Sequence, residues 1–190
     1  MDKDHIQDHG LIEIPRKKEL IYRGNYLEYH RDEVELPNGK TSYREYLHHP
    51  GAIAVVPILD NGDVLLVRQF RYATGQVLLE IPAGKLEAGE PIETAVIREL
   101  TEETGYKSEK IVHLLSTWTT PGFTDEVIHL YLATNLQFCA GQPDADEFLE
   151  VVKIPYLKLK EMVRAKEITD AKTVLALVLI ELNDLWTQKT

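Results

Sequence analysis

The sequence predicts a fold of the α/β class, or α+β in the broad sense, in which helices pack on a mixed sheet. Two observations predict it. Short segments with the pattern of strands recur along most of the chain and are joined by hairpin signals, and helical segments are interleaved with them. With 190 residues, of which 44% are hydrophobic, the chain is long enough to bury a sizeable core.

The N-terminal part is predicted to form a small antiparallel meander. Three segments alternate Tyr, Val and Leu with charged residues, as half-buried strands do: 19–22, 26–36 and 41–47. Asn38 and Gly39 stand between the last two, and this dipeptide is a strong hairpin signal because both residues tolerate positive φ. The turn-forming segment 49–51 follows, so we expect the meander to occupy residues 1–48 and a main domain to occupy residues 49–190.

The main domain is predicted to contain several strands and three helices. The strand-like segments are 52–59, 64–68, 77–81, 111–118, 127–132 and 150–154. A first helix can open at Pro91 and end at Gly105, because proline suits the first helical position and glycine the position after the last. A short helix at 156–165 precedes a final one, which runs from Asp170, a good N-cap, to about residue 185.

Composition limits the partners and the compartment. Asp and Glu number 31 against 21 Lys and Arg, a formal net charge of -10, and no basic stripe is present for phosphate backbones. We therefore expect no nucleic acid and no anionic membrane as partner, and an anionic substrate would have to meet local cations or bound metal. Cys139 is the single cysteine, which suits a reducing cytoplasm. The first residues lack a signal-peptide pattern, and the longest aliphatic stretch, 174–180, is far below the roughly 20 residues of a membrane span.

The helix expected between Pro91 and Gly105 breaks its own hydrophobic pattern. On a wheel with about 100° per residue, Glu99 and Glu103 fall within or at the edge of the apolar arc that Val96 helps to define. Like charges one turn apart repel each other, and partial burial raises the cost. A divalent cation would neutralise the pair, since it is a hard ion suited to carboxylate oxygens. A helix solvated on one side is the alternative.

The linear pattern around this helix is more specific. Gly84 is followed after five residues by Glu90, and after seven more by Arg98-Glu99-Leu100-Thr101-Glu102-Glu103-Thr104-Gly105-Tyr106. This pattern resembles the Nudix box of the Nudix hydrolases at every charged and glycine position. It departs only at Tyr106, a packing position where an aliphatic residue is usual, so the chemistry of the box should be retained.

The resemblance implies an α/β/α sandwich on a mixed sheet and a hydrolase of nucleoside diphosphates linked to another group. Mg²⁺ ions, or Mn²⁺ as the alternative, would bind at the box helix, neutralise charge and activate water. Glu102 is expected to support catalysis there, and Arg98 to hold a carboxylate in place rather than touch substrate. The implied metal ligands are Glu99, Glu103, the backbone carbonyl of Ala83, and Asp146.

Features outside the box are similar to the ADP-ribose pyrophosphatase branch of this family. Pro121 lies fifteen residues after Tyr106, and Arg68-Gln69-Phe70-Arg71 precedes Glu80-Ile81-Pro82-Ala83-Gly84. The branch also implies that the N-terminal meander exchanges between two subunits, so a homodimer is expected. The implied substrate-binding residues are Arg71 for the diphosphate, Arg44 and Glu45 for the nucleoside side, Glu87 for ribose or the metals, and Gly122, Phe123 and Thr124 along the pocket.

Some of these assignments have a simpler alternative. Arg44, Glu45 and Glu87 lie in a strand or loop where solvated charges are expected. One of four tyrosines can stack on adenine, although tyrosines in strands mostly pack: Tyr26, Tyr29, Tyr43 and Tyr46.

The catalytic base is expected in an acidic loop before a late strand, Asp144-Ala145-Asp146-Glu147-Phe148. Glu147 is the first choice because it directly precedes Phe148, and Asp146 and Asp144 are close alternatives. A base must come within hydrogen-bonding distance of the attacking water, a distance that sequence does not supply. An acidic turn with a purely structural role is the other interpretation.

The resulting hypothesis is a Mg²⁺-dependent pyrophosphatase that cleaves ADP-ribose to AMP and ribose 5-phosphate. The alternative is a pyrophosphatase for another nucleoside diphosphate sugar, such as GDP-mannose. A third hypothesis is a non-catalytic Nudix module that senses a nucleotide, which the intact Glu99, Glu102 and Glu103 disfavour.

Overall fold

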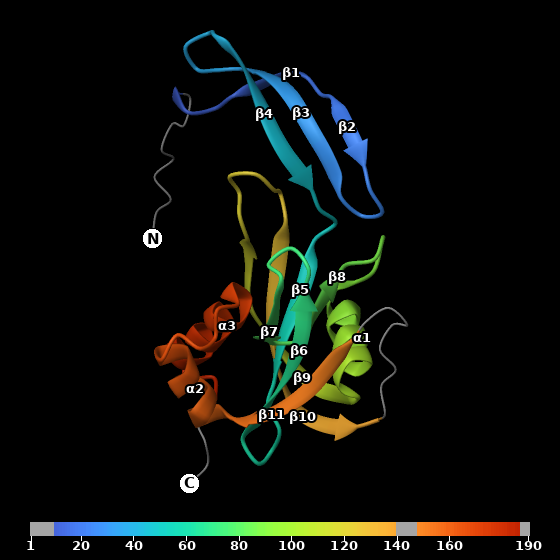
Figure 1. Ribbon diagram of the computed structural model, residues 1–190, viewed down its shortest axis with the longest axis vertical. Helices are drawn as coiled ribbons and strands as arrows, with labels where there is room; N and C mark the ends of the chain where they lie inside the picture. The colour runs from blue at the N-terminus through green and yellow to red at the C-terminus, as the bar shows by residue number, and fades with distance from the viewer. Residues whose placement is uncertain (1–9, 140–147, 187–190) are drawn as a thin grey trace. The chain divides into compact units, whose positions relative to one another are not determined.

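The computed structural model describes residues 10–139 and 148–186 and confirms a mixed fold of strands and helices (Figure 1). The chain divides into two compact units. One unit contains Met1–Pro50 and Trp118–Glu126, and the other contains Gly51–Thr117 and Val127–Thr190. Within the described ranges, no helix has the length and apolar character needed to cross a membrane.

The first unit is built on a four-stranded antiparallel sheet in which β3 pairs with each of the other three strands. Its strands are β1 (Ile14–Lys17), β2 (Leu20–Arg23), β3 (Glu28–Glu35) and β4 (Thr41–His48). The last three confirm the predicted meander, and β1 is an addition. Gly39 has a φ of 78° in the β3–β4 turn, as the Asn38-Gly39 signal predicts.

A segment far along the sequence completes the first unit. The Leu47 N–H donates to the Phe123 carbonyl at 2.8 Å, and the Asp125 N–H donates to the Leu47 carbonyl at 3.2 Å. These bonds attach the segment 118–126 to the end of β4. The unit has almost no core of its own, because Asp32 and Val34 are its only buried residues in the described part of the chain.

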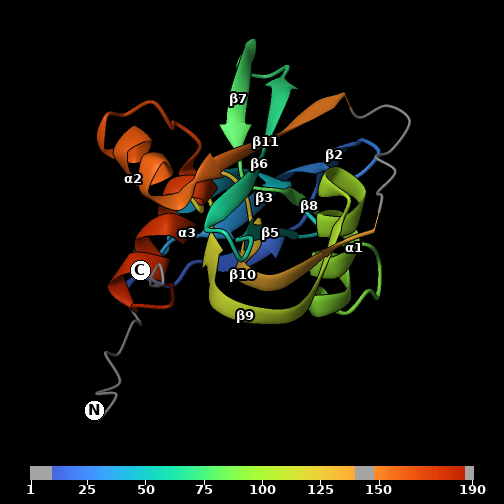
Figure 2. The same ribbon diagram turned by 90° about the horizontal axis from the view of Figure 1, so that it is seen from below.

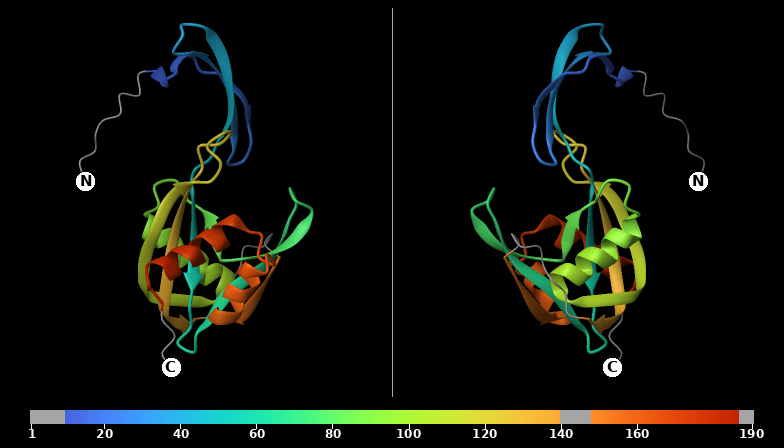
Figure 3. Two further views of the ribbon diagram at one scale, coloured as in Figure 1. Left: turned by 90° about the vertical axis from the view of Figure 1, so that its left-hand side faces the viewer. Right: turned by 90° about the vertical axis from the view of Figure 1, so that its right-hand side faces the viewer.

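The second unit contains two sheets. The first has the strand order β8-β5-β10-β9; β10 runs parallel to β5 and β8 antiparallel to it, so the sheet is mixed, as predicted. The second sheet has the order β11-β6-β7 and is antiparallel. Figure 3 shows the β6–β7 hairpin projecting from the unit. The strands are β5 (Ala52–Pro57), β6 (Asp63–Arg71), β7 (Gln76–Glu80), β8 (Ala83–Lys85), β9 (Tyr106–Trp118), β10 (Val127–Phe138) and β11 (Leu149–Pro155).

Helices cover the mixed sheet on both faces. Helix α1 (Ile92–Thr104) lies on one side of the strands, and α2 (Tyr156–Arg164) and α3 (Ala171–Leu182) lie on the other (Figure 2). Strand β5 shows why, because successive side chains of a strand point to opposite faces. Ala54 and Val56 join the core cluster beneath α2 and α3, and Ile53 and Val55 join the one beneath α1.

The ends of α1 follow the sequence signals closely. The helix begins at Ile92, one residue after the predicted start, with Pro91 at the N-cap. It ends at Gly105, whose φ of 74° is left-handed and suits glycine, and the Gly105 N–H bonds to the Thr101 carbonyl. The first and last residues of the helix are therefore set by Pro91 and Gly105, and the side chains of the site described next lie between them.

Candidate active site

Two glutamates of α1 face the interior of the second unit. Glu99 is 8% exposed and Glu103 is 2% exposed, and they share the buried face with Val96 and Leu100. The helical wheel predicted this arrangement, and a helix solvated on that side is excluded. Two carboxylates one turn apart are thus removed from water, which costs free energy unless neighbouring groups compensate their charge.

The backbone of strand β8 lies directly against these two carboxylates. A Cβ atom placed on Gly84 would lie 1.8 Å from Glu99 Oε1, so only glycine allows the Glu99 carboxylate to occupy this position. The Ala83 N–H donates a hydrogen bond to Glu103 Oε2 at 3.0 Å. The glycine of the box and the residue before it therefore have direct geometric roles beside the two acids.

Arg98 binds two glutamates of the helix and one glutamate that precedes it. Its guanidinium binds Glu90 with two hydrogen bonds of 3.0 Å, through Nε and Nη2. Its Nη1 donates to Glu99 at 2.8 Å and to Glu102 at 3.0 Å. The hydrogen bond from Arg98 lowers the pKa of Glu90, and the same contact raises the pKa of Arg98. This geometry agrees with the expectation that Arg98 holds carboxylates in place.

The donor set of this region fits a hard divalent cation. Glu99 and Glu103 present carboxylate oxygens from one buried face, and the missing Cβ of Gly84 makes room for the Glu99 carboxylate itself. Within the described ranges, no three His, Cys, Asp or Glu side chains are already arranged to hold a metal ion. The predicted ligand Asp146 and the predicted bases Glu147 and Asp144 lie outside the described residues.

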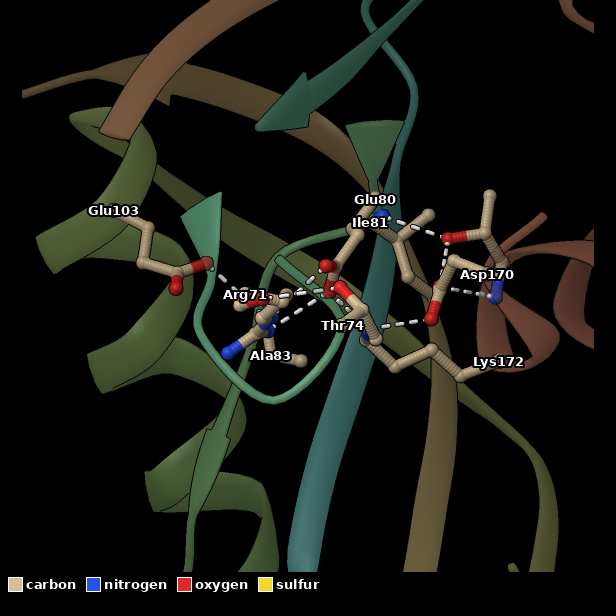
Figure 4. A network of polar contacts seen from close by, with 9 residues as sticks. Arg71, Thr74, Glu80, Ile81, Ala83, Glu103, Asp170 and Lys172 are labelled. Carbon is tan, nitrogen blue, oxygen red and sulfur yellow. Dashed lines mark hydrogen bonds and ion pairs between the residues drawn. The ribbon is translucent and has the colours of Figure 1, made fainter. Parts of the chain in front are cut away.

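A second network joins the β6–β7 hairpin to α3 (Figure 4). Glu80, at the end of β7, is 1% exposed and receives two hydrogen bonds from Arg71, 2.9 Å from Nε and 2.8 Å from Nη2. The Lys172 Nζ also donates to Glu80, and it binds Asp170 Oδ1 at 2.9 Å. Arg71, predicted to bind the diphosphate, is thus held side-on by a buried carboxylate.

Asp170 and Thr173 connect this network to the backbone. Asp170 caps α3 by accepting from the Thr173 N–H at 3.0 Å, as the sequence predicted for this residue. The Thr173 hydroxyl in turn accepts from the Ile81 N–H at 2.9 Å. Glu80 and Lys172 were not singled out from the sequence. A single charged residue within the otherwise apolar segment 77–81 is the signal that could have identified Glu80.

The other predicted substrate-binding residues make local contacts and do not belong to the network of Arg71 and Glu80. Within the first unit, Arg44 donates to Glu13 and to the Tyr43 carbonyl. Glu45 forms an ion pair there, with its Oε1 3.7 Å from Arg31 Nε. Phe123 is exposed, and its carbonyl belongs to the pairing with β4. In the second unit, the Glu87 N–H donates to Glu90 at 3.4 Å. Gly122 and Thr124 belong to the first unit. No atom lies within 4 Å of where a Cβ on Gly122 would be, and Thr124 Oγ1 accepts from the Glu126 N–H.

We predict that Gly84→Ala weakens divalent-cation binding with little effect on folding. The new methyl group collides with the carboxylate end of Glu99, a flexible side chain that can move away and lose its position. Calorimetric titration with Mn²⁺ should show affinity reduced by about tenfold or more, and thermal unfolding should change little. Gly10→Ala is the matched control, since nothing lies within 4 Å of its added carbon. Equal Mn²⁺ affinity in the two variants would refute the role of Gly84.

The buried Glu80 predicts a specific acid sensitivity. Burial by itself raises the pKa of Glu80, but the hydrogen bond from Arg71 and the charge of Lys172 outweigh it, so its pKa lies below the ordinary 4.5. A lowered folded pKa contributes stability above the unfolded value that is lost as pH falls through the folded value. Glu80→Gln should therefore lower the unfolding free energy by about 3 kcal/mol at pH 7. This difference should shrink below about pH 4.5.

Urea unfolding between pH 3 and 7 measures this difference. Glu150→Gln is the control, because Glu150 forms an exposed pair with Arg68 that should contribute about 0–1 kcal/mol at any pH. A Glu80→Gln effect that did not depend on pH would show that the carboxylate charge is not the cause.

Comparisons with known proteins identify relatives along most of the chain. The family model described as NUDIX domain matches residues 48–178. An ADP-ribose pyrophosphatase of Bacillus subtilis (strain 168) is 41% identical over 88% of this chain and 91% of that protein. A methanol dehydrogenase activator of Bacillus methanolicus is 42% identical over 88% and 92%. A GDP-mannose pyrophosphatase of Shigella flexneri is 33% identical over 88% and 95%.

A solved structure supports the fold independently. The crystal structure of an ADP compounds hydrolase matches with a TM-score of 0.79, over 90% of this chain and 94% of that one. At 23% sequence identity, this similarity concerns the fold alone. Since the family model covers residues 48–178 and the Bacillus subtilis relative is 41% identical over nearly the whole chain, the chain belongs to the Nudix family.

Proposed function

We propose that this Nudix protein is a Mg²⁺-dependent hydrolase that cleaves the diphosphate of ADP-ribose to AMP and ribose 5-phosphate. The observation that carries the proposal is the buried pair on α1, with Glu99 against the backbone of Gly84 and Glu103 bound by the Ala83 N–H. The 41% identical relative named as an ADP-ribose pyrophosphatase supports the substrate. Mn²⁺ is the alternative ion, because it accepts the same oxygen ligands.

The residues of the helix would hold the ions. Glu99 and Glu103 would be the principal ligands, joined by the backbone carbonyl of Ala83 and by Asp146, with Glu102 in support. When bound, the ions neutralise charge on the diphosphate and lower the pKa of a coordinated water. Arg98 orients the acids, since it binds Glu90, Glu99 and Glu102 at once.

Other residues would bind the substrate and accept the proton. Arg71 suits a diphosphate because a guanidinium offers a planar set of N–H donors to phosphate oxygens. Glu147 would remove the proton from the attacking water, with Asp146 and Asp144 as alternatives. The remaining substrate contacts that we propose are Arg44, Glu45, Glu87, Gly122, Phe123 and Thr124.

A homodimer with exchanged N-terminal strands is part of the proposal. The sheet of the first unit buries only Asp32 and Val34 among its described residues, too little for independent stability. It also exposes Ile14, Ile21 and Tyr22, which a second copy of the chain could cover. The single Cys139 supports the reducing cytoplasm as the compartment.

The substrate assignment is tested with purified protein, Mg²⁺ and a panel of nucleoside diphosphate sugars. ADP-ribose should give the highest kcat/KM. GDP-mannose is the second candidate, because a GDP-mannose pyrophosphatase is 33% identical over 88% of this chain. A much higher kcat/KM for GDP-mannose would replace ADP-ribose by that substrate, and no hydrolysis of any member would favour a nucleotide-sensing role.

We predict that Glu103→Gln abolishes turnover without unfolding the protein. The substitution keeps the size of the side chain and its ability to accept from the Ala83 N–H, but removes the charge that would bind the ion. Turnover should fall by at least about a hundredfold. Glu109→Gln, at an exposed position of β9, is the control and should retain wild-type activity. Wild-type turnover by Glu103→Gln, with both variants folded by circular dichroism, would reject the metal role.

One chain has a mass of 21.7 kDa. Light scattering at micromolar concentration should give twice this mass. Deletion of residues 1–48 should yield a monomer, because it removes the proposed exchanged strands. A monomeric mass for the intact protein would refute the dimer.

A further inference from the structure

Glu80 stands out as a buried carboxylate with two cations around it. It is 1% exposed, and a buried carboxylate needs a compensating positive charge. Arg71 alone would supply that charge, through its two hydrogen bonds of 2.9 and 2.8 Å. Lys172, 15% exposed, adds a second cation to the same carboxylate from the opposite side of the network (Figure 4). The pairing of Glu80 and Arg71 therefore does not by itself explain Lys172.

The position of Lys172 in its helix is unfavourable. It is the second residue of α3, and the N-terminus of a helix carries a partial positive charge that disfavours a cation. Asp170 offsets part of this cost by binding the Lys172 ammonium while it caps the helix. Two carboxylates, Glu80 and Asp170, bind the Lys172 ammonium at this unfavourable position. This indicates that a cation is needed on the α3 side of Glu80.

The Arg71 guanidinium is the group that Lys172 can influence through Glu80. In the described structure, Nε and Nη2 of Arg71 face Glu80, and the side chain is still 40% exposed. Its remaining nitrogen, Nη1, lies on the other edge of the guanidinium. The hydrogen bond to Glu80 raises the pKa of Arg71 most, and the charge of Glu103 on α1 adds to it. Arg71 thus stands between the carboxylate that holds it and the acidic face of α1 (Figure 4).

We propose that Lys172 is a positioning residue for diphosphate binding. The inference rests on the proposed function, in which Arg71 binds the diphosphate. Lys172 holds the Glu80 carboxylate from the α3 side, so Glu80 presents Arg71 in one orientation. Asp170 also binds the Lys172 ammonium, so the four side chains carry no net charge and the effect of Lys172 is on the orientation of Glu80 and Arg71. Lys172 acts through Glu80 and Arg71, without touching the substrate.

A positioning role predicts a particular kinetic pattern. Loss of Lys172 should weaken an interaction made equally with bound substrate and transition state, so KM rises while kcat is nearly unchanged. For Lys172→Met we expect KM for ADP-ribose to rise about tenfold. Lys172→Arg keeps a cation in place and should restore most of the affinity.

The decisive experiment measures binding without turnover. Methylenediphosphonate, a non-hydrolysable diphosphate, is titrated by calorimetry at saturating Mg²⁺ into wild type, Lys172→Met, Arg71→Met and the double variant. Lys172→Met should weaken binding about tenfold in the presence of Arg71 and less than about twofold in its absence, because coupled residues are not additive. Lys172→Gln replaces Lys172→Met if thermal unfolding shows that the latter is not folded.

Lys160→Met is the matched control. Lys160 is similarly buried, at 22% exposed, and pairs with Glu181 between α2 and α3. Its loss should leave diphosphate affinity unchanged. Unchanged affinity in Lys172→Met, or equal weakening with and without Arg71, would overturn the positioning role. If wild type binds the diphosphonate with this coupling but does not hydrolyse ADP-ribose, the proposed function fails and the role of Lys172 stands.

Discussion

The burial of two carboxylates on one face of α1 is the constraint on which the rest of the site depends. Glu99 and Glu103 occupy helix positions that face the core, where an isolated charge is costly. The neighbouring chain is arranged to tolerate them, since Gly84 leaves space beside Glu99 and the Ala83 N–H binds Glu103. A fold selected for stability alone would place apolar residues there, so the arrangement indicates a functional demand on these oxygens.

Two networks of ion pairs hold the charged side chains of the site. Arg98 binds Glu99 and Glu102 of α1 and Glu90 just before the helix, which lowers the repulsion among these carboxylates and fixes their positions. Arg71 of the β6–β7 hairpin and Lys172 of α3 both bind the buried Glu80, and Asp170 binds Lys172. The net charge of -10 thus leaves the diphosphate to be met by individual cations such as Arg71 and by the proposed metal ions.

The sequence predicted features that depend on local periodicity and missed those that depend on distant packing. The wheel predicted the burial of Glu99 and Glu103, because a helix repeats every 3.6 residues whatever surrounds it. The contact between Glu80 and Lys172 joins residues 92 apart, and only the packing of α3 against the sheet brings them together. The pairing of Leu47 with the segment 118–126 was missed for the same reason. The acidic loop with Glu147 lies outside the described residues, so the catalytic base stays a prediction.

The most direct measurement of the central claim is the effect of Mn²⁺ on thermal unfolding of wild type and of the double variant Glu99→Gln/Glu103→Gln. An ion that binds only the folded state at 100 times its Kd adds about 2.7 kcal/mol of stability. Wild type should therefore melt several degrees higher in Mn²⁺ than in EDTA, and the double variant should melt at the same temperature in both. An equal rise in both proteins, or no rise in wild type, would contradict the claim that these buried glutamates bind the metal.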